Sequence, residues 1–290
     1  MATAVIRTRP PRTQRAPGQT RSGTIIIAFL ALVLIALMLA PVAYIILGGF
    51  RSNSDITVDP SGFPTIWHWE NYVDVLTSGV FWRQVLNSTI AAVATTAFTV
   101  GLGLMAAFGL SRYSFRGRGV LYALFTAGLM FPMTVAITPL YILVRDLGLA
   151  NSLAGVIVPQ IAFALPMTII ILVPFLAAIP NELQEAAAID GCSRLGFFWR
   201  MVLRLSLPGV ITVGILAFIA SWNSYMLPLF ILNNEAAYTL PLGTQAFASR
   251  YSVDTAKVLA FTSLSMIPAL VFFSLFERRI VGGLTGAVKG

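Results

Sequence analysis

Long apolar stretches alternate with short polar segments along this chain. A helix needs about 20 apolar residues to cross a lipid bilayer. Six stretches meet or approach that length, and they cover residues 24–48, 84–110, 120–144, 152–179, 208–232 and 258–276. The pattern predicts an all-α integral membrane protein, with six transmembrane helices between residues 24 and 277.

The composition agrees with a membrane protein. Hydrophobic residues make up 57% of the chain and charged residues 10%, whereas about a quarter of the residues in a soluble domain are charged. Four of the polar segments (the N-terminus, 111–119, 180–207 and the C-terminus) together hold 14 Lys and Arg but 4 Asp and Glu, and the other three hold 5 and 7. Basic loops stay on the cytoplasmic side, so we predict a multi-pass protein of the cell membrane with both termini cytoplasmic. The basic residues therefore indicate the membrane topology, and no basic patch remains that could bind nucleic acid.

The two ends of the chain are predicted to be tails. Residues 1–23 carry five arginines, several prolines and no acid, as in a disordered basic tail. A cleaved signal peptide is the alternative, but the apolar run that follows is long for one. We therefore expect an uncleaved first helix that is interrupted or ends near Pro41. Residues 278–290 are glycine-rich and are predicted to form a cytoplasmic C-terminal tail.

Several positions inside the spans can be interpreted as structural or as functional. Gly103 and Ala107 are small residues at a spacing that permits close helix contact. Prolines in the third and fourth spans can kink helices or serve a pathway. The fifth span contains Trp222, Asn223 and Tyr225 in its most polar group. These side chains either bond to a neighbouring helix or line a cavity, and the sequence leaves both open.

The segment 180–207 is a polar island that is predicted to hold two short helices. Asn181 is expected to cap the first, from 182 to 190, and Gly191 to end it in a left-handed conformation. Ser193 is expected to cap the second. Its apolar face is predicted from residues at helical spacing, which are Leu195, Phe198, Met201, Val202 and Leu205. Pro208 is expected to begin the next span. The alanine-rich first helix lets another protein approach closely, so the island is predicted to be a docking surface.

The chemistry that the chain lacks narrows its function. The predicted span interiors contain no Asp, Glu, Lys, Arg or His, which weakens an ion-driven carrier without removing it. There is no Walker A sequence and no nucleophile–base pair, so no catalytic residue is predicted. Cys192 is the single cysteine, and no metal or cofactor motif is present. A membrane bundle without its own energy source is expected to need a soluble partner that supplies energy.

The island resembles the EAA loop of ATP-binding-cassette (ABC) importer permeases. Glu185-Ala186-Ala187 followed by Gly191 matches the core of that loop. Other stretches are similar to further family patterns, among them Asn71-Tyr72, Asn87-Ser88, Phe131-Pro132 and Trp222-Asn223 with Pro228. The tail, Gly283-Leu284-Thr285 through Gly290, is most similar to the maltose-type carbohydrate uptake branch. Three positions depart from the pattern, with Met201 for isoleucine, Arg204 for proline and Ser224 for a frequent acid. Without that proline, the second loop helix is expected to continue toward Pro208.

The resemblance implies a type I ABC importer permease fold and an assembly in the lipid bilayer. Its partners would be an ABC ATPase dimer, a second and different permease subunit, and an external solute-binding protein. ATP hydrolysis would belong to the ATPase, so this chain would be no enzyme. The residues of the coupling helix would be Glu185, Ala186, Ala187, Asp190 and Gly191. The resemblance favours a sugar or oligosaccharide as the solute. The alternatives are another polar solute, such as a polyamine, phosphate ester or amino acid, or a stand-alone secondary transporter.

Overall fold

The computed structural model describes residues 21–247 and 253–288, with side chains for 25–247 and 253–274. It divides into two units, residues 1–45 and 46–290. Most of the predicted N-terminal tail, residues 1–20, lies outside the described residues. All the regular elements that are described are helices, which confirms the predicted all-α class.

The first unit contains most of helix α1 (Arg21–Gly48). Its apolar side chains from Ile25 to Leu39 are exposed, as expected of a helix surrounded by lipid. The prediction of an interruption near Pro41 is wrong, since the helix continues through that residue. A single proline removes one backbone hydrogen bond, and a membrane helix tolerates that loss.

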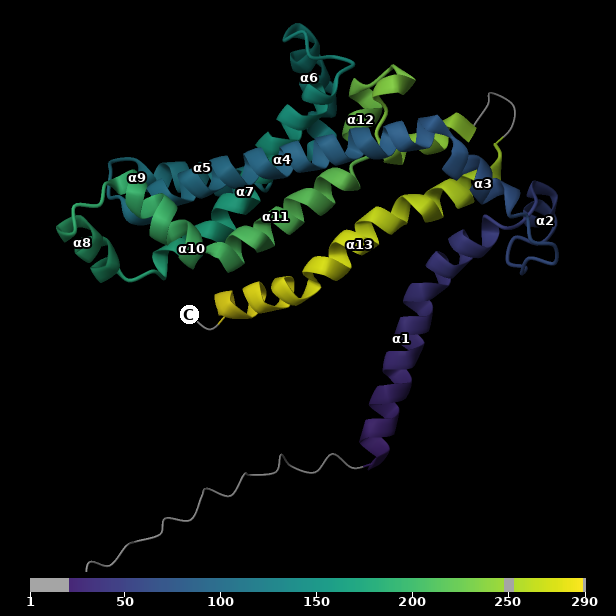
Figure 1. The fold of residues 1–290 in the computed structure, drawn as a ribbon, viewed down its shortest axis with the longest axis horizontal. Helices are drawn as coiled ribbons and strands as arrows, with labels where there is room; N and C mark the ends of the chain where they lie inside the picture. Colours follow the sequence, from purple (N-terminus) through teal and green to yellow (C-terminus); the bar gives the residue numbers. More distant parts are fainter. Residues whose placement is uncertain (1–20, 248–252, 289–290) are drawn as a thin grey trace, which may run out of the picture. The chain divides into compact units, whose positions relative to one another are not determined.

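The second unit is a bundle whose long members are α4 (Gly79–Arg112), α7 (Leu153–Ala177), α11 (Leu207–Trp222) and α13 (Thr255–Val288). Short helices α2 (Asn53–Val58) and α3 (Glu70–Thr77) lie at one end of it. The other end holds α8 (Asn181–Ile189), α9 (Arg194–Phe197) and α10 (Leu203–Leu205) (Figure 1). Helix α13 extends through most of the residues for which a C-terminal tail was predicted.

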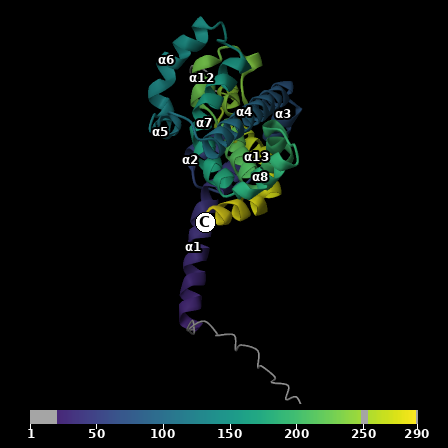
Figure 2. The same ribbon diagram turned by 90° about the vertical axis from the view of Figure 1, so that its left-hand side faces the viewer.

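Two predicted spans are broken. The third consists of α5 (Arg118–Gly128) and α6 (Met133–Asp146), which meet at 102°. Pro132 precedes α6, and the residue before a proline avoids helical geometry. The fifth span ends as α11 at Trp222, and α12 (Met226–Ile231) follows separately. Helices α6 and α12 lie beside each other (Figure 2).

The number of spans depends on how bent helices are counted. Four helices are long and apolar enough to cross a membrane alone, and there are up to six if each bent pair is one span. One of those pairs joins α11 to residues 194–205, at an angle of 77°. Prolines 159, 166 and 174 leave α7 as one helix. Of the five prolines in the third and fourth spans, Pro132 alone lies at a break.

Helix α4 packs closely against α7 near its middle. A Cβ atom on Gly103 would lie 2.4 Å from the Cγ2 atom of Thr168, and Ala107 is fully buried. The expected close contact through small residues is therefore present. The adjoining core continues toward the α8 end, where Leu172, Leu176 and Phe198 are buried.

Buried amides hold the loops at the α2–α3 end. The side-chain amide nitrogen of Asn71 donates to the carbonyl oxygens of Gly49 and Arg51, at 3.0 and 3.1 Å. The amide nitrogen of Asn87 donates to the carbonyls of Ala236 and Tyr238, each at 2.9 Å. These bonds satisfy backbone groups of irregular segments, so two positions of the family pattern are loop anchors.

The packing predicts a contrast between two glycines of α4. Gly103→Leu should lower the free energy of unfolding by about 1–3 kcal/mol, because the new side chain enters filled space beside Thr168. Gly109→Leu is the matched control, since a Cβ atom there meets nothing within 4 Å. Thermal unfolding of the purified protein in detergent measures both. Equal midpoints would contradict the close contact.

Candidate coupling surface and translocation pathway

Helix α8 ends in a glycine-dependent turn. Gly191 has a φ of +72°, and its N–H donates to the carbonyl of Ala188 at 3.1 Å. The N–H of Cys192 donates to the carbonyl of Ala187 at 2.8 Å. This pair of bonds is the Schellman motif, in which a left-handed residue reverses the chain after a helix. The predicted helix end at Gly191 is confirmed.

The start of α8 differs from the prediction. Pro180 is the N-cap and makes no side-chain cap bond, so the proposed cap at Asn181 is wrong. The carbonyl oxygen of the Asn181 side chain instead accepts from Nη1 of Arg112 at 2.9 Å. Nη2 of the same arginine donates to the carbonyl of Ile179 at 2.5 Å. The end of α4 thus holds both the end of the α7 segment and the start of α8.

The second helix of the loop begins as predicted and continues differently. Ser193 caps it by accepting from the N–H of Gly196 at 3.1 Å. Residues Phe198–Val202 then form a π-helical segment, η1, before α10. Phe197, Phe198 and Val202 are buried, whereas Leu195 and Leu205 are 71% and 51% exposed. A wider π turn shifts the positions that follow it around the axis, so the predicted apolar face is only partly correct.

The departure at Arg204 has the expected effect. The helical segment continues to Leu205 instead of breaking at the family's proline position. The hydroxyl of Ser206 donates to the carbonyl of Val202 at 2.6 Å. Helix α11 then begins at Leu207, one residue before the predicted start at Pro208.

The predicted coupling residues occupy one exposed turn-and-helix surface. Glu185, Ala186, Asp190 and Gly191 are exposed, and Ala187 is buried beneath them at 7% exposure. Beside α8 is a polar pocket of about 410 Å³. Its lining includes Glu185, Gln184 and both Arg112 and Arg194. Arg112 is engaged by Asn181 and Ile179, so the exposed charged groups that the pocket offers to a partner are the Glu185 carboxylate and the Arg194 guanidinium.

A second candidate region lies where the broken spans meet α4 and α7. A cavity of about 490 Å³ is lined by residues from both breaks, among them Met133, Thr134, Asn223 and Tyr225. Gln160 of α7 also lines it and is 6% exposed. Its side-chain oxygen accepts from the hydroxyls of Thr95 at 3.0 Å and of Ser221 at 2.6 Å. A buried polar cluster thereby joins α4, α7 and α11 deep in the bundle.

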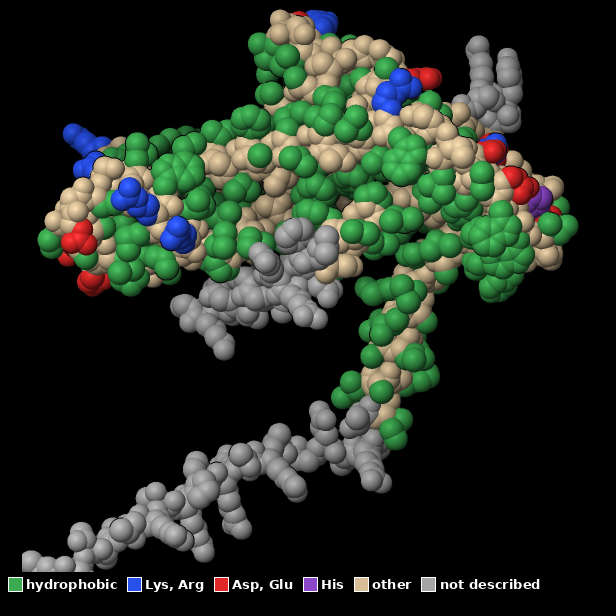
Figure 3. All heavy atoms as spheres, in the orientation of Figure 1, with side chains coloured by type: hydrophobic (Ala, Val, Ile, Leu, Met, Phe, Trp, Pro, Cys, Tyr) green, Lys and Arg blue, Asp and Glu red, His purple; other side chains and the backbone are tan. Residues whose placement is uncertain are grey.

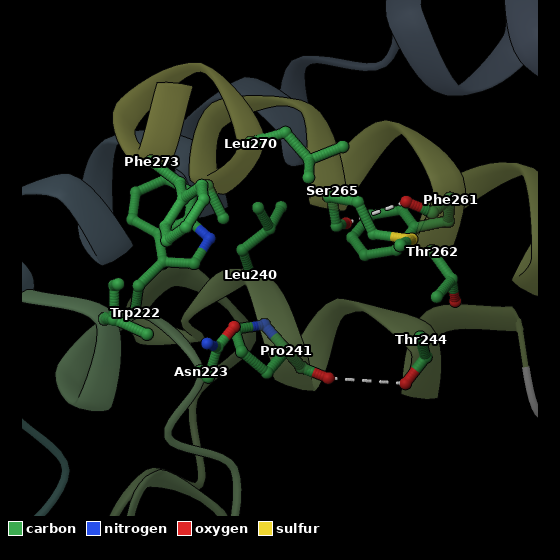
Figure 4. A pocket seen from close by; sticks show the side chains of 13 residues that line it. Trp222, Asn223, Leu240, Pro241, Thr244, Phe261, Thr262, Ser265, Leu270 and Phe273 are labelled. Atoms are coloured by element: carbon green, nitrogen blue, oxygen red, sulfur yellow. Dashed lines mark hydrogen bonds between the residues drawn. The ribbon is translucent and has the colours of Figure 1, made fainter. Parts of the chain in front are cut away.

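The polar group of the fifth span divides between two cavities. Trp222 is buried against Leu240 and Phe261 and lines a second cavity of about 490 Å³, between α11, the 3₁₀-helical segment η3 (Leu240–Phe247) and α13 (Figure 4). Tyr225 lines the cavity at the two breaks and not the cavity beside Trp222, whereas Asn223 lines both of these cavities. The sequence did not point to Gln160, because a single uncharged amide lies there among apolar residues. The sequence feature that could have identified it is an amide side chain inside a largely apolar span.

Known proteins resemble the chain over most of its length. The family described as "Binding-protein-dependent transport system inner membrane component" matches residues 99–281. The probable ABC transporter permease protein YurM of Bacillus subtilis is 35% identical, over 90% of this chain and 87% of that protein. The diacetylchitobiose uptake system permease NgcG of Streptomyces coelicolor is 32% identical, over 86% and 83%.

This chain belongs to the family of binding-protein-dependent transport system inner membrane components. A crystal structure of a bacterial ABC transporter involved in alginate import has the same fold, with a TM-score of 0.78 at 22% identity, over 91% of this chain and 99% of that one. The permease therefore has the type I importer fold and is a multi-pass protein of the cell membrane. Among its described side chains, no group of three or more His, Cys, Asp or Glu could hold a metal.

The turn after α8 predicts a specific effect of side chains at Gly191. An L-residue such as alanine is strained at a φ of +72°, whereas asparagine adopts this region more readily. Gly191→Ala should raise hydrogen exchange of the amides at residues 187–192 about fivefold or more, and Gly191→Asn should raise it less. Gly119→Ala, at an exposed helical glycine with open space around it, is the control. Unchanged exchange in Gly191→Ala would contradict the strain.

Proposed function

We propose that this permease imports a sugar or oligosaccharide delivered by an external binding protein, with energy from a separate ABC ATPase. Membership of the family carries the proposal. The relative NgcG is part of a diacetylchitobiose uptake system, and the transporter of like fold is involved in alginate import. Both names refer to saccharides, which supports a saccharide here over a polyamine, a phosphate ester or an amino acid.

Helix α8 is the proposed coupling helix. The turn at Gly191 lets α8 project while Ala187 and the following segment remain packed on the core. Exposed Glu185 would meet a polar cleft of the ATPase, with Ala186 allowing close backbone approach and Asp190 and Gly191 at the tip. Arg112 ties the helix to α4, so a displacement of α8 would be passed to a long membrane helix.

The proposed transport cycle is rigid-body alternating access. ATP binding closes the ATPase dimer and moves the coupling helices that are seated in it. This subunit and a second, different permease then change from inward-open to outward-open. The cavity at the two breaks is the proposed part of the translocation pathway, with Asn223, Tyr225 and Gln160 presenting polar groups to a hydroxyl-rich solute. Trp222 would form the buried wall behind Asn223.

Both termini are proposed to be cytoplasmic, on the same side as α8. Arginines gather at the α8–α10 end of the bundle, as the face in Figure 3 shows. Residues 49–83, at the α2–α3 end, have two Lys or Arg residues, Arg51 and Arg83. This asymmetry follows the positive-inside rule.

Replacement of one carboxylate tests the coupling role. Glu185→Gln should reduce ATP-driven uptake about tenfold or more, since a charge-assisted hydrogen bond is lost while the shape is kept. The assay uses proteoliposomes that contain this permease, the second permease and the ATPase, with the loaded binding protein outside. Association with the ATPase should weaken in parallel.

The matched control is Glu182→Gln, on the same exposed helix one turn earlier. It should leave uptake within about twofold of the unsubstituted value. Wild-type uptake in Glu185→Gln would rule out the coupling role. Ion-driven flux through liposomes with this chain alone would instead support a secondary transporter.

The cavity predicts a second set of variants. Gln160→Met and Asn223→Ala should each lower uptake about tenfold, because polar groups that face the solute are lost. Thr99→Val is the control, because its buried hydroxyl has no hydrogen-bond partner and lies outside the cavity. Full uptake by both cavity variants would exclude this pathway.

A further inference from the structure

The helical segment from Arg194 to Leu205 presents three different rows of side chains around its axis. Phe198 and Val202 are buried in the core. The next row holds Trp199, which is 60% exposed, and Leu203. Arg200 and Arg204 form the row after that and are exposed. Arg200 and Leu203 are three positions apart and are therefore neighbours on the helix surface, so the arginine row borders the row of Trp199 and Leu203.

The middle row forms one wall of an apolar groove. The groove has a volume of about 480 Å³ and lies between this segment, α4 and α11. Its lining is almost wholly apolar and includes Val100, Gly101, Met105, Trp199, Leu203 and Val210. A Cβ atom on Gly101 would meet nothing within 4 Å, so open space adjoins the backbone there. The groove suits a flexible hydrocarbon.

The angle between the segment and α11 favours a position of the groove at a membrane surface. The segment meets the membrane helix α11 at 77°, so it lies nearly in the membrane plane when α11 crosses the bilayer. A helix in that position with Trp and Leu beside Arg is typical of the lipid–water interface. Two arginines at headgroup depth attract anionic lipids.

We propose that this groove binds an anionic phospholipid. The headgroup phosphate pairs with Arg200 and Arg204, and an acyl chain lies along Trp199 and Leu203 in the groove. The charge of the arginine row and the continuity of the groove with two membrane helices favour lipid over a protein partner. Arg204 replaces the proline of the family pattern, so the lipid site depends on a residue that the coupling role does not use.

The direct test is lipid binding to the intact transporter, by native mass spectrometry in mild detergent with added phosphatidylglycerol or phosphatidylcholine. The wild type should retain phosphatidylglycerol preferentially. The double variant Arg200→Gln/Arg204→Gln should bind it about 25-fold more weakly, because each arginine near an anionic surface contributes roughly fivefold. Arg116→Gln/Arg118→Gln makes the same charge change on the preceding basic loop and should have no effect.

A groove-filling variant separates the acyl chain from the headgroup. Gly101→Leu should displace the lipid although both arginines remain, whereas Gly109→Leu, on the same helix and also in open space, should not. A photo-crosslinking residue at position 199 should capture phospholipid in native membranes. Equal binding of the two lipids, full binding by the arginine double variant, or capture of a protein at position 199 would overturn the proposal.

Discussion

The close approach of α4 and α7 at Gly103 is the contact on which both candidate regions depend. Helix α4 carries Thr95 at the cavity and Arg112 at the loop, about 25 Å apart at 1.5 Å per residue. Helix α7 carries Gln160 and leads directly into the loop. In lipid, where helices gain little from the hydrophobic effect, small residues allow such contact through packing alone. The pair forms a continuous frame between the candidate coupling surface and the proposed pathway.

The breaks in the third and fifth spans have a cost and a use. Irregular backbone at membrane depth is tolerated where it is enclosed by protein or lines a cavity. Here both breaks border one cavity, where Gln160 accepts two hydroxyl hydrogen bonds. A bundle of six straight helices would have no comparable polar recess. The interruptions place polar groups at the proposed pathway without any buried charge.

The segment after α8 connects three environments. Its inner row packs on the core, its capped start leads from the coupling turn, and its outer rows face the proposed lipid. The helical segment continues past Arg204 to Leu205, so these rows extend along it to its end. A continuous helical segment that packs on the core on one side and on the proposed lipid on the other would transmit a displacement of α8 to α11 more fully than a broken segment.

Local rules in the sequence were sufficient for the all-helical membrane class, the turn at Gly191, the cap at Ser193 and the close contact at Gly103. Each depends on backbone geometry or on residue size over a few positions. The tertiary structure decided the rest. Asn181 pairs with Arg112, 69 residues away, instead of capping its own helix. The prolines within α7 did not break that helix, because long-range packing decides where a helix breaks. Gln160 gave little signal in the sequence, because the hydrogen bonds that bring its amide to Thr95 and Ser221 exist only in the tertiary structure.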